Sequence, residues 1–116
     1  MIFVLILSMF EKDEWTQQEL YKYSKELEKE NRKIVLIDTI LKPIENIETM
    51  VYNPYEMALM PENTVFVFYC DTGKTTKERL NHYRKKFPNH KCVSLRGGRA
   101  YWRPNFRISK EIEKNV

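Results

Sequence analysis

The chain has 116 residues, of which 42% are hydrophobic and 31% are charged, with only 3 glycines and 5 prolines. This length supports one domain, and the composition excludes a disordered or collagen-like chain. The net charge of +4 is uneven, because residues 1–60 carry 7 basic and 11 acidic side chains and residues 61–116 carry 13 and 5. The basic half favours an anionic partner, either a small oxyanion or a nucleic acid, although a solvated basic face has the same composition. Nothing further in the sequence supports a nucleic acid.

The chain opens with a mostly apolar run of ten residues, MIFVLILSMF, which ends before Glu11. The run is too short to cross a membrane, and it has neither the basic start nor the small-residue cleavage site of a signal peptide. It therefore predicts a first strand that leads into the domain. We expect a cytoplasmic protein that has no contact with a membrane.

Four later runs are rich in β-branched or aromatic residues and predict four further strands. The first of them has no polar alternation before Asp38, which is typical of a strand buried on both faces. The third ends at Cys70 and is the strongest strand in the chain. The runs are KIVLID (33–38), MVYN (50–53), TVFVFYC (64–70) and KCVSL (91–95).

Helix signals lie between these runs. Thr16 and Glu19 have the spacing of a capping box, and Thr75 and Glu78 repeat it. Pro54 suits the first turn of a short helix. The predicted helices cover about residues 16–30, 55–59, 75–87 and 108–116.

Buried strands that alternate with helices predict an α/β domain built on a mostly parallel five-stranded sheet, with helices on both faces. The whole chain, residues 1–116, is expected to form this single domain. Ligand sites of such sheets lie at the carboxyl ends of the strands. Cys70 lies at such an end.

The loop after the strongest strand contains a Gly-Lys-Thr as well as this cysteine. A phosphate-binding P-loop needs another glycine five residues before Gly73, and that position is Phe68, inside the strand. The phosphatase pattern Cys-x5-Arg needs an arginine at position 76, which is Thr76. Nucleotide binding and phosphatase chemistry are therefore both disfavoured.

What remains is a short connection from a strand end to a helix start, in which Gly73 permits a tight turn. Successive backbone N–H groups in such a loop converge on the Cys70 sulfur, and the helix N-terminus adds partial positive charge. Lys74 strengthens both effects. The pattern favours a thiolate or a persulfide anion, and the alternative is a buried cysteine that packs as a small hydrophobe.

These residues also carry a family resemblance. VFVFYCDTGKTTKERLNHY (65–83), followed by VSLRGGRAYW (93–102), resembles the second half of a rhodanese-like domain, and IVLID resembles the family's early strand. The resemblance covers about residues 34–102 and implies a rhodanese-like fold and sulfur transfer through a persulfide on Cys70. It implies a structural role for Asp38. It also implies a substrate-binding loop formed by Asp71, Thr72, Gly73, Lys74 and Thr75.

The chain departs from the family pattern at three places, one of which is that the family's Gly-His-Ile-Pro-Gly-Ala segment has no counterpart in IENIETMVYNP. Thr39 and Ile40 stand where the family usually has an arginine soon after the aspartate. Asp71 stands where active members often have a basic residue, and a carboxylate that faced the site would oppose ionisation of the thiol. These departures keep open the alternative of a catalytically weak rhodanese-homology module that binds a partner.

Several residues outside the loop complete the predicted site. Gly97 and Gly98 are expected to form a tight turn at its rim, and Arg96 and Arg99 flank this rim. Either the two arginines attract an anionic donor or they are simply solvated.

Other residues are expected to lie outside the site. Cys92 should lie at the opposite end of the sheet from Cys70 and not pair with it. Trp102 is expected in the core and His82 and His90 on the surface, with no metal site.

The leading hypothesis from the sequence is a single-domain sulfurtransferase without a cofactor. Its donor would be thiosulfate or a persulfide, and its acceptor would be cyanide, a thiol or a protein. The sulfur would be held as a persulfide on Cys70. The alternative is the weakly active binding or regulatory module.

Overall fold

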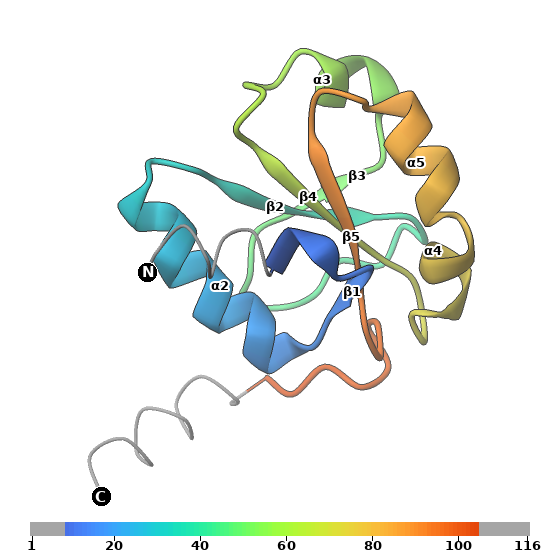
Figure 1. Ribbon diagram of the computed structural model, residues 1–116. Coiled ribbons are helices and arrows are strands. Elements are labelled where there is room, and N and C mark those ends of the chain that lie inside the picture. The colour runs from blue at the N-terminus through green and yellow to red at the C-terminus, as the bar shows by residue number, and fades with distance from the viewer. Residues whose placement is uncertain (1–8, 105–116) are drawn as a thin grey trace, which may run out of the picture.

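In the part of the chain that the structure describes, residues 9–104, five parallel strands form one sheet in the order β1-β5-β4-β2-β3 (Figure 1). This computed structural model confirms the predicted α/β class with a five-stranded sheet. The strands are β1 (Glu14–Trp15), β2 (Ile34–Asp38), β3 (Thr49–Val51), β4 (Val65–Tyr69) and β5 (Lys91–Leu95). The helices are α2 (Gln17–Lys29), α3 (Pro54–Ala58), α4 (Lys74–Glu78) and α5 (Leu80–Lys86).

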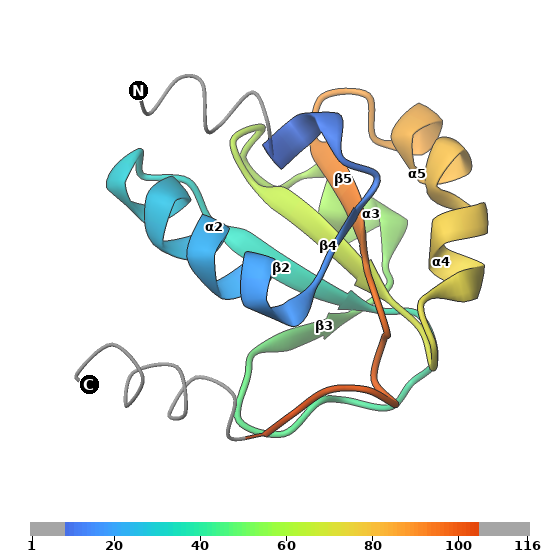
Figure 2. The ribbon, with the colours of Figure 1, turned by 60° about the horizontal axis from the view of Figure 1, so that its bottom comes forward.

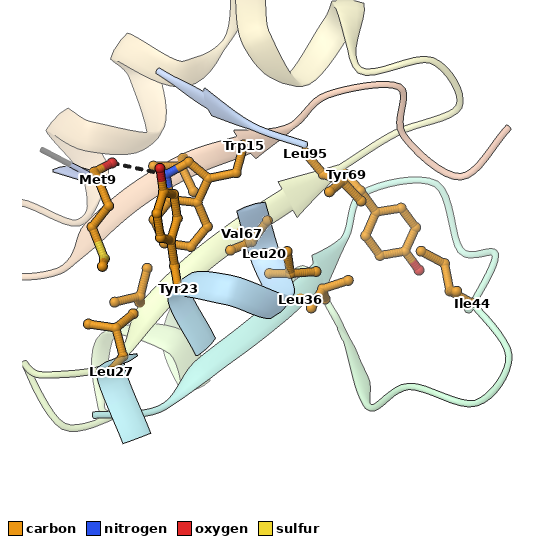
Figure 3. Close-up of a cluster of buried hydrophobic side chains, with 12 residues drawn as sticks. Met9, Trp15, Leu20, Tyr23, Leu27, Leu36, Ile44, Val67, Tyr69 and Leu95 are labelled. Carbon is orange, nitrogen blue, oxygen red and sulfur yellow. Dashed lines mark hydrogen bonds between the residues drawn. The ribbon is translucent and has the colours of Figure 1, made fainter. Parts of the chain in front are cut away.

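Helices cover both faces of the sheet, as predicted. Figure 2 shows α2 on one face and α4 and α5 on the other. Side chains of the central strand β4 alternate between these faces. Val67 and Tyr69 pack with α2 in one buried cluster (Figure 3), whereas Phe66 and Phe68 pack with α5 in a second cluster. All five residues of β4 are buried, which explains its unbroken apolar sequence.

The first predicted helix is confirmed, including its capping box. The Thr16 side chain accepts a hydrogen bond from the Glu19 backbone N–H at 3.1 Å, and the Glu19 carboxylate accepts one from the Thr16 N–H at 3.1 Å. Each bond satisfies a backbone donor that would have no partner inside the helix. The apolar residues on one side of α2 are buried against the sheet, namely Leu20, Tyr23 and Leu27.

The helix after Cys70 differs from its prediction in two respects. Its N-cap is Gly73 and not Thr75, because Gly73 adopts a φ of 88° and starts α4 at Lys74. No side chain caps this end, so the predicted second capping box is wrong. The helix is also divided at Arg79 into α4 and α5. The apolar side chains on one side of this segment, Leu80, Tyr83 and Phe87, are buried.

The first strand that the structure describes comes after the apolar run. Met9 and Phe10 are helical, and residues 1–8 lie outside the described residues. This strand is the two-residue β1, which pairs with β5 at the edge of the sheet and is held in place by Trp15. Trp15 is fully buried, its indole N–H donates to the Met9 carbonyl at 2.9 Å, and its own carbonyl accepts from the Arg96 N–H at 2.8 Å.

The remaining predicted elements have mixed outcomes. The strand before Pro54 begins one residue earlier and ends two residues earlier than predicted, and Pro54 occupies the first turn of α3 as expected. The predicted helix over residues 108–116 lies outside the described residues. Among the helices of residues 9–104, none has the length and apolar character that crossing a membrane requires.

Candidate functional site

The centre of the site is the Cys70 thiol, which lies under the first turn of α4. Its Sγ accepts a hydrogen bond from the Gly73 backbone N–H at 3.2 Å and lies 3.5 Å from the Thr76 hydroxyl oxygen. Only 5% of Cys70 is exposed. The short loop from β4 to α4 therefore wraps around the sulfur, as the sequence predicts.

Two buried hydroxyl groups extend this arrangement into the protein. Thr76 Oγ1 and Ser94 Oγ share a hydrogen bond of 2.7 Å, and both side chains are fully buried. A thiolate has no proton to donate. When Cys70 is ionised, a hydrogen bond between the two groups can be donated only by Thr76, whose hydroxyl also lies 3.4 Å from the Gly73 carbonyl, and Ser94 then donates to Thr76.

The two cysteines differ in pKa because their surroundings differ. Burial raises the pKa of Cys70, but the Thr76 hydroxyl and the backbone N–H groups of the loop donate to the sulfur and hold the pKa below its ordinary value. Burial raises the pKa of Cys92 to about 12. Of the two thiols, Cys70 is the one that ionises more readily, and the thiolate is the nucleophile.

The positions of the cysteines agree with the prediction that they cannot pair. Cys92 is next to Phe66 in the sheet, at the amino end of β5. Phe66 precedes Cys70 by four residues, which separates the two thiols by ~13 Å along the strands. Both cysteines are free.

The loop after β5 donates backbone hydrogen bonds to the cysteine loop. The N–H groups of Arg99 and Ala100 donate to the carbonyls of Cys70 and Asp71 at 2.9 and 2.8 Å. Gly98 has a φ of 57°, and a Cβ atom there would lie 2.4 Å from the Cys70 carbonyl oxygen. The predicted turn at Gly97 and Gly98 is thus present, and Gly98 permits this close approach.

Most side chains of the cysteine loop point away from the sulfur. The groups that donate to Sγ are the Thr76 hydroxyl and the backbone N–H groups of Gly73 and of the first helical turn. The carboxylate of Asp71, the residue that fits the family pattern least well, belongs to an exposed side chain. The other exposed residues of the loop are Thr72, Lys74 and Thr75.

The predicted residues around the loop have partners within the protein. Arg96 lies 4.0 Å from the Glu14 carboxylate, and Arg99 donates to the Pro43 carbonyl at 3.2 Å. Both arginines are exposed. Asp38 is buried at the end of β2, where one carboxylate oxygen accepts from the Ile40 N–H at 2.9 Å, in keeping with a structural role.

Two predictions about single residues are wrong. His90 is buried and not on the surface, because the turn after α5 brings its ring onto Phe66, with 4.7 Å between ring centroids. Its Nε2 also forms a 2.9 Å hydrogen bond with the Met60 carbonyl. Trp102 is only partly buried, at the edge of the first cluster. His82 is exposed, as expected.

Sequence reasoning missed three residues of the site. Ser94 is the one polar residue between buried apolar neighbours in β5, and this interruption is its signal in the sequence. Thr76 gives no signal of its own in the sequence, where the pattern shows only that the arginine of a phosphatase is missing. Arg79 follows it by three residues, on the same side of the helix as Tyr83.

A hollow of about 370 Å³ has in its wall Thr39, whose hydroxyl and N–H donate to the carbonyl of Tyr69, the residue directly before Cys70. Its walls are formed by Thr39, Tyr52, Arg79, His82 and Tyr83. Among residues 9–104, no group of three or more histidine, cysteine or acidic side chains is arranged to hold a metal ion.

Neither protein-family models, nor curated proteins, nor solved structures give a significant match to this chain.

Proposed function

We propose that the protein is a sulfurtransferase that carries a sulfane sulfur on Cys70. The observation that supports this most strongly is the convergence of the Gly73 N–H and the Thr76 hydroxyl on the sulfur. Donors arranged in this way stabilise a negative charge on the sulfur of a thiolate or of a persulfide. The resemblance of the loop and of the Gly97-Gly98 segment to rhodanese-like domains supports the same function.

The proposed reaction has two displacement steps. The Cys70 thiolate attacks the outer sulfur of thiosulfate, the S–S bond breaks, and sulfite leaves with the electron pair. An acceptor such as cyanide or a thiolate then attacks the outer sulfur of the Cys70 persulfide. The second S–S bond breaks, and Cys70 leaves as a thiolate, ready for the next cycle.

In both steps the loop performs the same task. Charge enters and leaves the Cys70 sulfur, and the donors around it are already in place before the reaction begins. Such preorganised donors stabilise developing charge without a cost of reorientation.

We place the protein in the cytoplasm, where reducing conditions keep an unpaired cysteine as a thiol.

The second candidate function is a module that binds a partner through this edge of the sheet without transferring sulfur. Two observations favour it. Only 5% of Cys70 is exposed, which leaves a donor little access. The exposed Asp71 carboxylate lies next to the thiol in the sequence and repels an anionic donor.

A transfer assay separates the two functions. With thiosulfate as donor and cyanide as acceptor, the wild-type protein should form thiocyanate, and Cys70→Ser should form none because its hydroxyl cannot carry sulfur as a persulfide. Cys92→Ser is the matched control and should retain activity, since it removes a thiol at the other end of the sheet. Equal activity in wild type and Cys70→Ser would refute the proposal.

A further inference from the structure

The hollow beside the cysteine loop is larger than thiosulfate requires. Its volume is about 370 Å³, within the range of sites for small organic molecules, which is ~300–1,000 Å³. A thiosulfate ion needs on the order of 150 Å³ if each of its non-hydrogen atoms takes the ~30 Å³ of one liquid water molecule. More than half of the hollow is therefore left for an organic group.

The hollow lies close to Cys70 and on the same face of the sheet. The Tyr83 ring in its wall stacks on Phe68, with 4.0 Å between centroids and an interplanar angle of 1°. Cys70 follows Phe68 by two residues, so its side chain points to the same face and lies roughly 7 Å further along the strand. Figure 2 shows the ends of β2 and β4 near the start of α4, where the cysteine loop runs.

Electrostatic coupling agrees with this proximity. Burial raises the pKa of Tyr83, the Arg79 guanidinium opposes this effect, and negative charge on Cys70 adds to it. Tyr83 is therefore within electrostatic reach of both Arg79 and Cys70.

The walls of the hollow combine flat apolar surfaces with one guanidinium group. Tyr52 and Tyr83 present rings whose centroids are 5.8 Å apart and whose planes are tilted by 48°. Arg79 lies in the wall beside Tyr83, and within residues 9–104 no carboxylate forms an ion pair with Arg79. Its fork of N–H donors matches the geometry of a carboxylate.

We propose, on the basis of the sulfurtransferase function proposed above, that this hollow holds the organic part of a thiol that exchanges sulfur with Cys70. The organic part is planar and carries a carboxylate, which binds Arg79 while the ring lies against Tyr52 and Tyr83. The thiol of this molecule reaches toward Cys70. The residues of the hollow thus select an aromatic carboxylate as the partner in the exchange.

The exchange needs no oxidant or reductant. The thiolate of the small molecule attacks the outer sulfur of the Cys70 persulfide, and a new S–S bond forms while the old one breaks. Cys70 leaves as a thiolate, and the small molecule leaves as a persulfide. The reverse reaction, in which Cys70 attacks the outer sulfur of the small-molecule persulfide, loads the enzyme.

A binding measurement with an unreactive probe tests the hollow without relying on sulfur transfer. The probe is 4-(methylthio)benzoate, whose thioether cannot exchange sulfur, and its neutral counterpart is 4-(methylthio)benzamide. Calorimetric titration of the wild-type protein should show the carboxylate binding at least ~10-fold more tightly, because a hydrogen bond to a charged partner contributes that much. Arg79→Gln should remove this difference.

Lys86→Gln is the matched control, because it removes the same charge from an exposed position of α5 outside the hollow. It should leave the preference for the carboxylate unchanged. Equal affinity of the wild type for the two probes, or the same loss in both variants, would overturn the assignment of the hollow. Circular dichroism of both variants checks that they are folded.

A second measurement connects the hollow to the exchange. The carboxylate probe should slow the loading of Cys70 by 4-carboxybenzyl persulfide and have little effect on loading by thiosulfate. If thiosulfate loads Cys70 but the protein does not bind the probe, this inference is refuted and the proposed function stands. If the probe binds but no donor loads Cys70, the proposed function and the exchange are both wrong.

Discussion

At the level of single residues, the structure gives Cys70 a chain of buried hydroxyl groups in place of a cationic side chain. Thr76 lies at the position where the phosphatase pattern has an arginine, and its hydroxyl is 3.5 Å from the sulfur. A hydroxyl donor stabilises a thiolate without adding a positive charge that would grip the oxygens of a phosphate. Thr76 is thus consistent with sulfur chemistry and disfavours phosphate chemistry.

Thr76→Val should raise the pKa of Cys70, because valine has a similar shape and no hydroxyl to donate. A hydrogen bond to a charged group contributes ~1.5–3 kcal/mol, which corresponds to a rise of about one to two pKa units. The measurement is the rate of iodoacetamide alkylation of Cys70 as a function of pH. The midpoint should move upward, so the variant should react more slowly than wild type at pH values below its new midpoint.

Thr75→Val is the control for this experiment, since Thr75 is the adjacent threonine and its side chain is exposed. Its alkylation midpoint should stay close to that of the wild type, because the backbone N–H that it contributes is retained. If the two variants shift the midpoint equally, the Thr76 hydroxyl has no special role at the sulfur.

At the level of elements, the site depends on two loops that fit together closely. The loop of residues 96–100 donates two backbone hydrogen bonds, of 2.9 and 2.8 Å, to carbonyls of the cysteine loop, residues 70–73. Gly73 and Gly98 both lack a Cβ at the contact, where it would come within 2.8 and 2.4 Å of a backbone oxygen. The position of the Cys70 carbonyl is therefore set by the loop after β5.

Gly98→Ala should strongly reduce both stability and sulfur transfer. The left-handed backbone conformation costs an alanine ~1 kcal/mol, and the clash with the Cys70 carbonyl adds to this cost by forcing the two loops apart. Gly97→Ala is the comparison, because Gly97 is also left-handed but its Cβ would meet the Tyr101 side chain at 3.0 Å. That contact involves the Tyr101 Cβ and needs a shift of only a few tenths of an ångström in an exposed residue.

Thermal unfolding and the transfer assay would both be measured on the two variants. We expect Gly98→Ala to lose more stability than Gly97→Ala and to lose activity as well. Equal losses would mean that the cost comes from backbone conformation alone and that the loop contact does not position the thiol.

The sequence predicts those elements whose signals are local. The apolar runs that end at Asp38 and Cys70 form strands because β-branched and aromatic residues fit a sheet buried on both faces. The strand β1 was not predicted, since two residues carry no periodicity and the burial of Trp15 determines their position. The Thr76 to Ser94 contact was also not predictable, because it depends on the packing of α4 against β5.

At the level of the whole molecule, the fold brings the acidic and basic halves of the sequence together. Asp13 pairs with Arg84 at 2.8 Å, and Glu14 lies 3.6 Å from Lys77 and 4.0 Å from Arg96. Each of these partly exposed pairs contributes little to stability. They do show that some of the basic charge which the sequence suggested for an anionic partner is neutralised within the protein.

The whole fold also assigns different environments to the two thiols. Cys70 lies at the carboxyl edge of the sheet, surrounded by loop N–H groups, and Cys92 lies at the amino end of its strand with its pKa raised by burial to about 12. Sulfur should therefore be loaded at one cysteine only.

Intact-protein mass spectrometry after treatment with thiosulfate, and separately with 4-carboxybenzyl persulfide, tests this claim most directly. We predict that the wild-type protein and Cys92→Ser each gain one sulfur atom with at least one of the two donors, that cyanide removes this atom, and that Cys70→Ser gains none. No gain of sulfur by the wild type with either donor, or the same gain in Cys70→Ser, would contradict the account.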